Sequence, residues 1–214
     1  MLKSTVSQVC LFMAANLAFI NYPMLAAIKI NTNLAISNDL ALNQPADAQS
    51  KKPEDPIFED IVLNRVDKLK QFLDRGGSPD RYFYAAVNAG AIDSVTMMIS
   101  RRANVNLPSD EGVTPLMTSV RITYRGTIEI TELLIKKGAN VNARASKGST
   151  ALMYASSGVA AHYEDDYVRV VRLLIKNGAK VNVQNKMGAT PLSIAKEGKW
   201  NKIMIVLKKA GAKF

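Results

Sequence analysis

A short pattern that recurs three times limits what this chain can fold into. It reads Gly-Ala-Asn-Val-Asn at 138–142 and Gly-Ala-Lys-Val-Asn at 178–182, and a shortened Gly-Ala stands at 211–212. Each copy follows a stretch with apolar residues at helical spacing, and the three units open with Thr-Pro-Leu or Thr-Ala-Leu at 114, 150 and 190. One helix pair cannot cover such an apolar stripe alone, so the units are predicted to stack and bury it between neighbours.

The distances between these landmarks support a repeat. From the Asn that closes one pattern to the Thr that opens the next unit there are always 8 positions, at 106–114, 142–150 and 182–190. The last unit fits a period of about 33 residues. Relative to it, the unit opening at Thr114 has three extra residues and the unit opening at Thr150 has seven. The connections are therefore constant, and the variation lies inside the helix pairs.

The same spacing finds two divergent units upstream. Arg102 stands where the closing pattern has Gly, and counting back 21 positions gives Arg81. Counting back 21 positions from Gly76 gives Asp55-Pro56. That pair suits a helix start, because the carboxylate can cap the first amides and proline is tolerated at the first position. Since Asp80 directly precedes Arg81, no hairpin is predicted between these two units.

The landmarks resemble the ankyrin repeat in their start, their end and their period. The resemblance implies an all-α repeat fold, an ankyrin-type solenoid of stacked helix pairs with short β-hairpin or turn connections. About five units are expected, near 55–80, 81–108, 109–144, 145–184 and 185–214. It also implies a non-catalytic protein-interaction module. With its predicted leader and its size, the chain resembles exported ankyrin-repeat proteins of bacteria.

The segment ahead of the repeats is of a different kind. After Lys3 the chain has no charged residue from 4 to 28, and an apolar centre at 9–20 is followed by Leu-Ala-Ala at 25–27. This pattern predicts a secretory signal peptide over 1–27, with export to the periplasm or the medium. The alternative is an uncleaved membrane anchor, because about 20 apolar residues suffice to span a bilayer. Residues 28–54 are predicted to be a disordered linker.

The chain has a formal net charge of +10. A basic surface can attract nucleic acid, anionic lipid or an acidic protein. The lysines lie mostly at predicted helix ends and hairpins without interleaved aromatic residues, which favours a solvated surface over a nucleic-acid interface. We expect a monomer with a protein partner, no small-molecule substrate, and membrane contact only if the leader is uncleaved.

The residue counts leave few routes to catalysis. The chain has one histidine, His162, and one cysteine, Cys10, which lies in the predicted leader. Cys-His nucleophiles and zinc sites with several His or Cys ligands therefore cannot be assembled. No Gly-rich phosphate loop is present either. We expect no catalytic residue, cofactor or metal, with a carboxylate-based hydrolase as the open alternative.

The extra residues fall between the two helices of adjacent units, at 121–125 and 157–165, so the two insertions should be neighbours in space. Three interpretations remain open. They can be surface loops or lengthened helices with local ion pairs. They can form a partner-binding patch built on tyrosines, which give large contact area at low entropic cost. The third is a metal site of His162 with Glu164, Asp165 and Asp166, disfavoured because adjacent acids on one loop seldom converge.

The resemblance also implies where a partner binds, in a groove lined by hairpin tips and first helices. The matching tip residues are Asp110, Glu111, Val113, Ser146, Lys147, Ser149, Lys186, Met187 and Ala189, and the helix residues are Met117, Arg121, Met153, Ser157, Ser193 and Glu197. From the insertions, Tyr124, Tyr163 and Tyr167 join the predicted partner-binding residues. Met117, Met153 and Ser193 replace the family's histidine, so its hydrogen bond to the hairpin is expected to be lost.

Overall fold

The computed structural model describes residues 56–121, 127–158 and 163–213, all within one compact unit of the chain. These residues form ten α-helices and one 3-10 helix, and no strand is found among them. The first helices of the successive pairs are α4 (Pro56–Val62), α6 (Phe83–Ala89), α8 (Pro115–Ser119), α10 (Ala151–Ser157) and α12 (Pro191–Glu197). The second helices are α5 (Val66–Asp74), α7 (Ile92–Ser100), α9 (Thr127–Lys136), α11 (Glu164–Lys176) and α13 (Asn201–Lys209), and the 3-10 helix η1 (Pro79–Tyr82) precedes α6.

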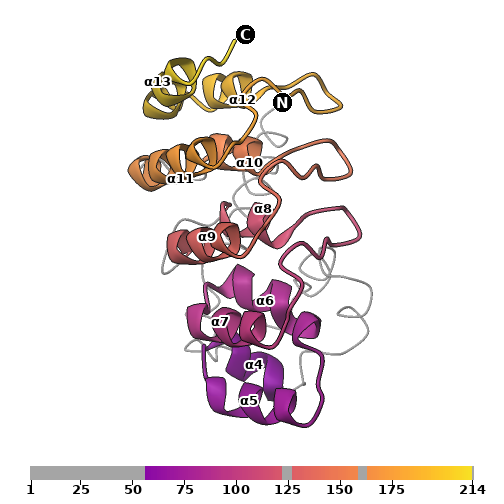
Figure 1. Cartoon of the computed structure of the whole chain (residues 1–214). Coiled ribbons are helices and arrows are strands. Elements are labelled where there is room, and N and C mark those ends of the chain that lie inside the picture. The colour runs from indigo at the N-terminus through magenta and orange to yellow at the C-terminus, as the bar shows by residue number, and fades with distance from the viewer. Residues whose placement is uncertain (1–55, 122–126, 159–162, 214) are drawn as a thin grey trace, which may run out of the picture. The chain divides into compact units, whose positions relative to one another are not determined.

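The helix pairs stack in chain order (Figure 1). Each first helix packs on the first helices before and after it, and the second helices form a parallel layer in the same way. The expected all-α solenoid of stacked helix pairs is thereby confirmed. The predicted leader and linker lie outside the described residues and stay predictions.

Threonine begins the three regular units as expected. The hydroxyl oxygens of Thr114, Thr150 and Thr190 accept hydrogen bonds from the backbone N–H three residues later, at 3.3, 3.4 and 3.1 Å. The expected loss of a hydrogen bond to the hairpin stays a prediction, because in two units the replacing side chain bonds to the capping threonine of its own helix. The Thr190 N–H, at the end of its hairpin, donates to Ser193 Oγ at 2.8 Å, and the Thr114 N–H donates to the Met117 sulfur at 3.5 Å. These side chains therefore act as acceptors although they are not histidine.

Left-handed residues end the second helices. Gly76, Gly138, Gly178 and Gly211 have φ values of 87°, 88°, 85° and 86°. Arg102 takes the same conformation with φ 69°, which confirms that it occupies the glycine position of its unit. An L-residue pays a steric cost there that glycine avoids.

Asparagines connect consecutive units. The side-chain oxygens of Asn106, Asn142 and Asn182 accept the N–H of Asn140, Lys180 and Lys213 at 2.7, 2.9 and 2.8 Å. Their side-chain nitrogens donate to the carbonyls of Gly138, Gly178 and Gly211 at 3.0, 2.9 and 3.0 Å. At the first junction, which has no hairpin, Asp80 accepts the Asn104 N–H at 2.6 Å. Each unit end is thus fixed by a side chain from the preceding connection.

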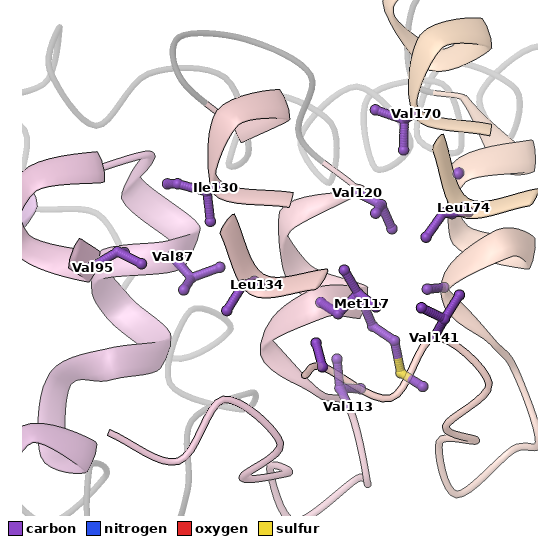
Figure 2. Close-up of a cluster of buried hydrophobic side chains, with 14 of the residues drawn as sticks. Val87, Val95, Val113, Met117, Val120, Ile130, Leu134, Val141, Val170 and Leu174 are labelled. Atoms are coloured by element: carbon purple, nitrogen blue, oxygen red, sulfur yellow. The ribbon is translucent and has the colours of Figure 1, made fainter. Parts of the chain in front are cut away.

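The core runs without a break through the stack, and Figure 2 shows its middle part. Ile130, Val170 and Ile203 stand eight positions before the closing glycines of their units and are at most 1 % exposed. In the first unit this position holds Lys68, whose side chain is 61 % exposed and whose Nζ lies 2.8 Å from the buried Asp60 carboxylate. The first described unit therefore presents a polar outer face where internal units present core, as a terminal unit must.

The last unit follows the same rule. Ile99, Ile135 and Ile175 stand three positions before the left-handed residue of their units and pack against the core, whereas Lys208 stands at that position in α13 and is exposed.

A cavity of about 490 Å³ borders the first unit beside Ile57, Lys68 and Phe72.

Candidate functional site

The hairpin tips form a hydrogen-bonded row. The Ser146 N–H donates to the Glu111 carbonyl at 2.8 Å, and the Lys186 N–H donates to the Lys147 carbonyl at 3.0 Å. Within one hairpin the Ala145 N–H donates to the Ser149 carbonyl at 2.9 Å. The tips are therefore tied to one another across units and not only to their own helices.

Most of the predicted tip residues are available at the surface. Asp110, Glu111, Ser146, Lys147, Lys186 and Met187 are exposed, and Ser149 and Ala189 are half-buried. Met187 is the most prominent, because 85 % of it is exposed at the tip of the last hairpin. Gly112 allows the tips to approach, since a Cβ there would lie 3.1 Å from the Ser146 nitrogen.

A cluster of polar and aromatic side chains lies on the first helices beside these tips. The Arg121 guanidinium, at the end of α8, stands 5.6 Å from the ring centroid of Tyr154 on α10. Tyr84 on α6 is hydrogen bonded to Thr118 on α8, and Arg121, Tyr154 and Glu111 are close enough to act on it electrostatically. We call Tyr84, Glu111, Thr118, Arg121 and Tyr154 the groove cluster. It joins three units.

Burial raises the pKa of the Tyr84 hydroxyl, and the hydrogen bond with Thr118 opposes that shift. The tyrosine therefore stays neutral and keeps its hydroxyl as a hydrogen-bonding group. Sequence reasoning named Arg121 and Glu111 but missed Tyr84. The available signal was its position three residues after Arg81, which corresponds to Met117 and Met153 in their units.

Four of the predicted partner-binding side chains are inside the stack. Val113, Met117, Met153 and Tyr167 are 5, 1, 2 and 1 % exposed, so the expectation that they face a partner is wrong. Three residues after the capping threonine, the side chain turns back under the hairpin, and Figure 2 shows Met117 among Val113 and Val141. The remaining helix residues are closer to the surface, with Arg121 and Ser193 half-buried and Ser157 and Glu197 exposed.

That the two insertions are neighbours stays a prediction, because residues 122–125 lie outside the described residues. Tyr167, which follows the second insertion on α11, donates its hydroxyl hydrogen to the carbonyl of Arg121, the first residue of the other insertion, at 2.9 Å. Its ring is buried and lies 6.4 Å from the ring of Trp200 in the last unit. Tyr163, just before α11, is 37 % exposed, whereas Tyr124 and His162 lie outside the described residues.

The acidic residues of the second insertion have partners in the protein. Glu164 accepts the Lys202 N–H at 2.9 Å and thereby caps α13, and Asp165 lies 2.8 Å from Lys202 Nζ. Asp165 raises the pKa of the Lys202 ammonium. Asp166 is 3.8 Å from Arg169. These contacts fit the interpretation of a lengthened helix with local ion pairs.

Two features are absent from the described residues. No group of three or more His, Cys, Asp or Glu side chains with the arrangement of a metal site is found among them. Within the same residues, no helix has the length and apolar character needed to cross a membrane.

Comparison with known proteins identifies the repeats. Residues 83–164 match the family described as ankyrin repeats (3 copies), and residues 147–186 match the ankyrin repeat as a single unit. No curated protein matches the chain. Ankyrin repeats are generic protein-interaction modules and are typically non-catalytic. Residues 83–186 are therefore similar to ankyrin repeats, and the described residues have the ankyrin-type solenoid fold.

Proposed function

We propose that this chain is an exported ankyrin-repeat module that binds a protein partner through the hairpin tips and the groove cluster, without catalysis. The observation that carries the proposal is the convergence of Tyr84, Arg121 and Tyr154 from three units next to Glu111. Tyrosine and arginine are enriched among residues that dominate binding energy. They stand here beside a row of tips that is held together before any partner arrives.

The tips offer a partner different chemistry along the stack. Asp110 and Glu111 are acidic, Lys147 and Lys186 are basic, and the exposed Met187 adds an apolar contact at the end. Such a graded surface favours one orientation of a partner with complementary charge. We infer that the partner is a folded protein or an extended segment long enough to touch several tips.

The experiment that tests the groove is crosslinking from defined positions in the full chain. A photoreactive residue is placed at Met187 or Ser157, and in a matched control at Thr96, which is exposed on the second helix α7. A protein crosslinked from the first two sites and not from Thr96 is then purified. The affinity of this purified partner for the chain should be about tenfold lower, or lower still, when the chain carries Arg121→Ala/Tyr154→Ala. Crosslinking from Thr96 alone, or an unchanged affinity of this variant, would contradict the proposal.

The export part of the proposal is supported by the uncharged segment at 4–28 and the small residues Ala26 and Ala27 at its end. Intact mass and N-terminal sequencing of the protein from fractionated cells test it. A chain beginning near Ile28 in periplasm or medium is the expected result. A full-length chain in the membrane would favour the second candidate, a membrane-anchored adaptor. An exported chain can serve in the periplasm or act as an effector on a host protein, and the crosslinked partner distinguishes these roles.

A further inference from the structure

Two neighbouring second helices carry matched rows of basic residues. On α11 and just beyond it, Arg172, Lys176 and Lys180 follow at intervals of four. The equivalent positions of the last unit, 33 residues later, hold Ile205, Lys209 and Lys213. All six residues are exposed, and α11 packs directly on α13. We call these six residues the outer basic patch.

The charges of this patch are not neutralised within the described parts of the chain, where no ion pair uses Arg172, Lys176, Lys180, Lys209 or Lys213. The acids of the first turn of α11 are already engaged, Asp165 with Lys202 and Asp166 with Arg169. The row on α9 that corresponds to Arg172 holds Glu132. Lys136 on α9 is the exposed equivalent of Lys176, so the row of last-turn lysines continues onto α9 while the Arg172 position there is acidic.

Compensation of the helix dipole explains only part of this arrangement. Basic residues are favoured in the last turn of a helix, which applies to Lys176 and Lys209. Arg172 lies a turn earlier in α11, and Lys180 and Lys213 lie beyond the helix ends. The backbone N–H groups of these two lysines are held by Asn142 and Asn182, so their places in the rows are fixed.

Ile205 is the unusual member of the patch. It is 55 % exposed, whereas the equivalent positions on α7, α9 and α11 hold Thr96, Glu132 and Arg172. An apolar side chain surrounded by lysines suits a partner surface that is negatively charged and has an apolar layer just below the charges. An anionic bilayer has both properties, and attracts each nearby Lys or Arg with about 1 kcal/mol.

We propose that the outer basic patch docks this chain on an anionic phospholipid surface. A nucleic acid would meet the charges but gain nothing from Ile205, and the six residues include no aromatic side chain on which a base could stack. Four patch residues lie on second helices and Lys180 and Lys213 lie just beyond them, whereas the groove cluster lies on or just after first helices and at a hairpin tip. The groove can therefore hold a protein while the patch contacts lipid.

The test is cosedimentation of the full chain with vesicles that contain about one third anionic phospholipid, compared with vesicles of neutral lipid only. The neutral vesicles measure any binding through the apolar segment at 4–28, which is the same in every variant. The patch variant is Lys176→Gln/Lys209→Gln. The matched control is Lys147→Gln/Lys186→Gln, which removes two exposed lysines from the hairpin tips and leaves the same net charge.

The patch variant should bind anionic vesicles about 30-fold more weakly than the natural chain, because it lacks two of the lysines facing the lipid. The control should lose clearly less, and Ile205→Ser should weaken binding several-fold without changing its dependence on salt. Equal losses in both double variants would show that only net charge matters and overturn the proposal. It would also be overturned if Lys176 and Lys209 were needed for binding duplex DNA but not vesicles. Neither result depends on whether the groove binds a protein.

Discussion

Trp200 donates its indole N–H to the backbone carbonyl of Ser157 at 2.7 Å, and so ties the last unit to the insertion of the unit before it. The ring fits there because two neighbours are glycines. A Cβ at Gly158 would lie 2.3 Å from the Trp200 ring, and a Cβ at Gly198 would lie 2.2 Å from it. The extra residues of the fourth unit thus hold the fifth in place.

Gly158→Ala should lower the free energy of unfolding by about 2–3 kcal/mol, because the new methyl group collides with Trp200 and φ at this position is positive. Urea denaturation measures the change. The matched control is Gly178→Ala, which has φ 85° and nothing within 4 Å of the added Cβ. This control should cost only about 1 kcal/mol. Equal losses would show that the ring does not constrain Gly158.

Arg102→Gly should raise the free energy of unfolding by about 0.5–1 kcal/mol. The substitution removes the steric cost of a left-handed residue at the end of α7, and the higher conformational entropy of glycine in the unfolded chain offsets part of this gain. Thermal melts of the two proteins show the difference. Arg101→Gly is the comparison, with φ −95° and a guanidinium 2.6 Å from Asp74. It should destabilise. A lower melting temperature for Arg102→Gly would argue against the left-handed assignment.

Asn142→Ala should cost about 1–2 kcal/mol, because it removes one hydrogen bond to Lys180 and another to Gly178 at the same junction. Chemical denaturation gives the value. Asn177→Ala, which loses a bond only to Leu173 of its own helix, should cost less than half as much. If the two variants were equally stable, the asparagines would not connect the units energetically.

Acid should weaken the first unit through Asp60. Hydrogen bonding and charge from Lys68 lower the pKa of this carboxyl below its usual 3.8, with a smaller contribution from Arg65. A carboxyl with a lowered pKa stabilises the fold above its unfolded pKa, and this stabilisation is lost as the pH falls through the folded pKa. Stability followed by circular dichroism from pH 6 downward should fall less steeply below about pH 4 in Asp60→Asn. Lys68→Met should show the same flattening, and Lys70→Met should not.

The sequence was sufficient for features that depend on local backbone chemistry. Thr114 and Thr190 were recognised as helix starts because a capping hydroxyl and a following proline are local signals. Arg102 was placed correctly because the register of its unit leaves only that position for the left-handed residue.

The candidate site was less accessible to such reasoning. Tyr84 and Tyr154 come together with Arg121 only after three units have stacked, so no local pattern marks them as a cluster. Tyr167 is predicted at the surface only in the interpretation of the insertions as a tyrosine-based partner patch. The protein instead adds a helical turn, which directs the ring into the core.

The polar face of the first unit restricts how this protein could have gained or lost repeats. A copy of an internal unit placed before Pro56 would have to bury the Asp60 and Lys68 pair, and removing such charges from water costs several kcal/mol per ion. A copy inserted between two existing units would meet complementary apolar faces on both sides. Duplication and deletion within the gene are therefore tolerated in the middle of the array, while its first unit has to remain first.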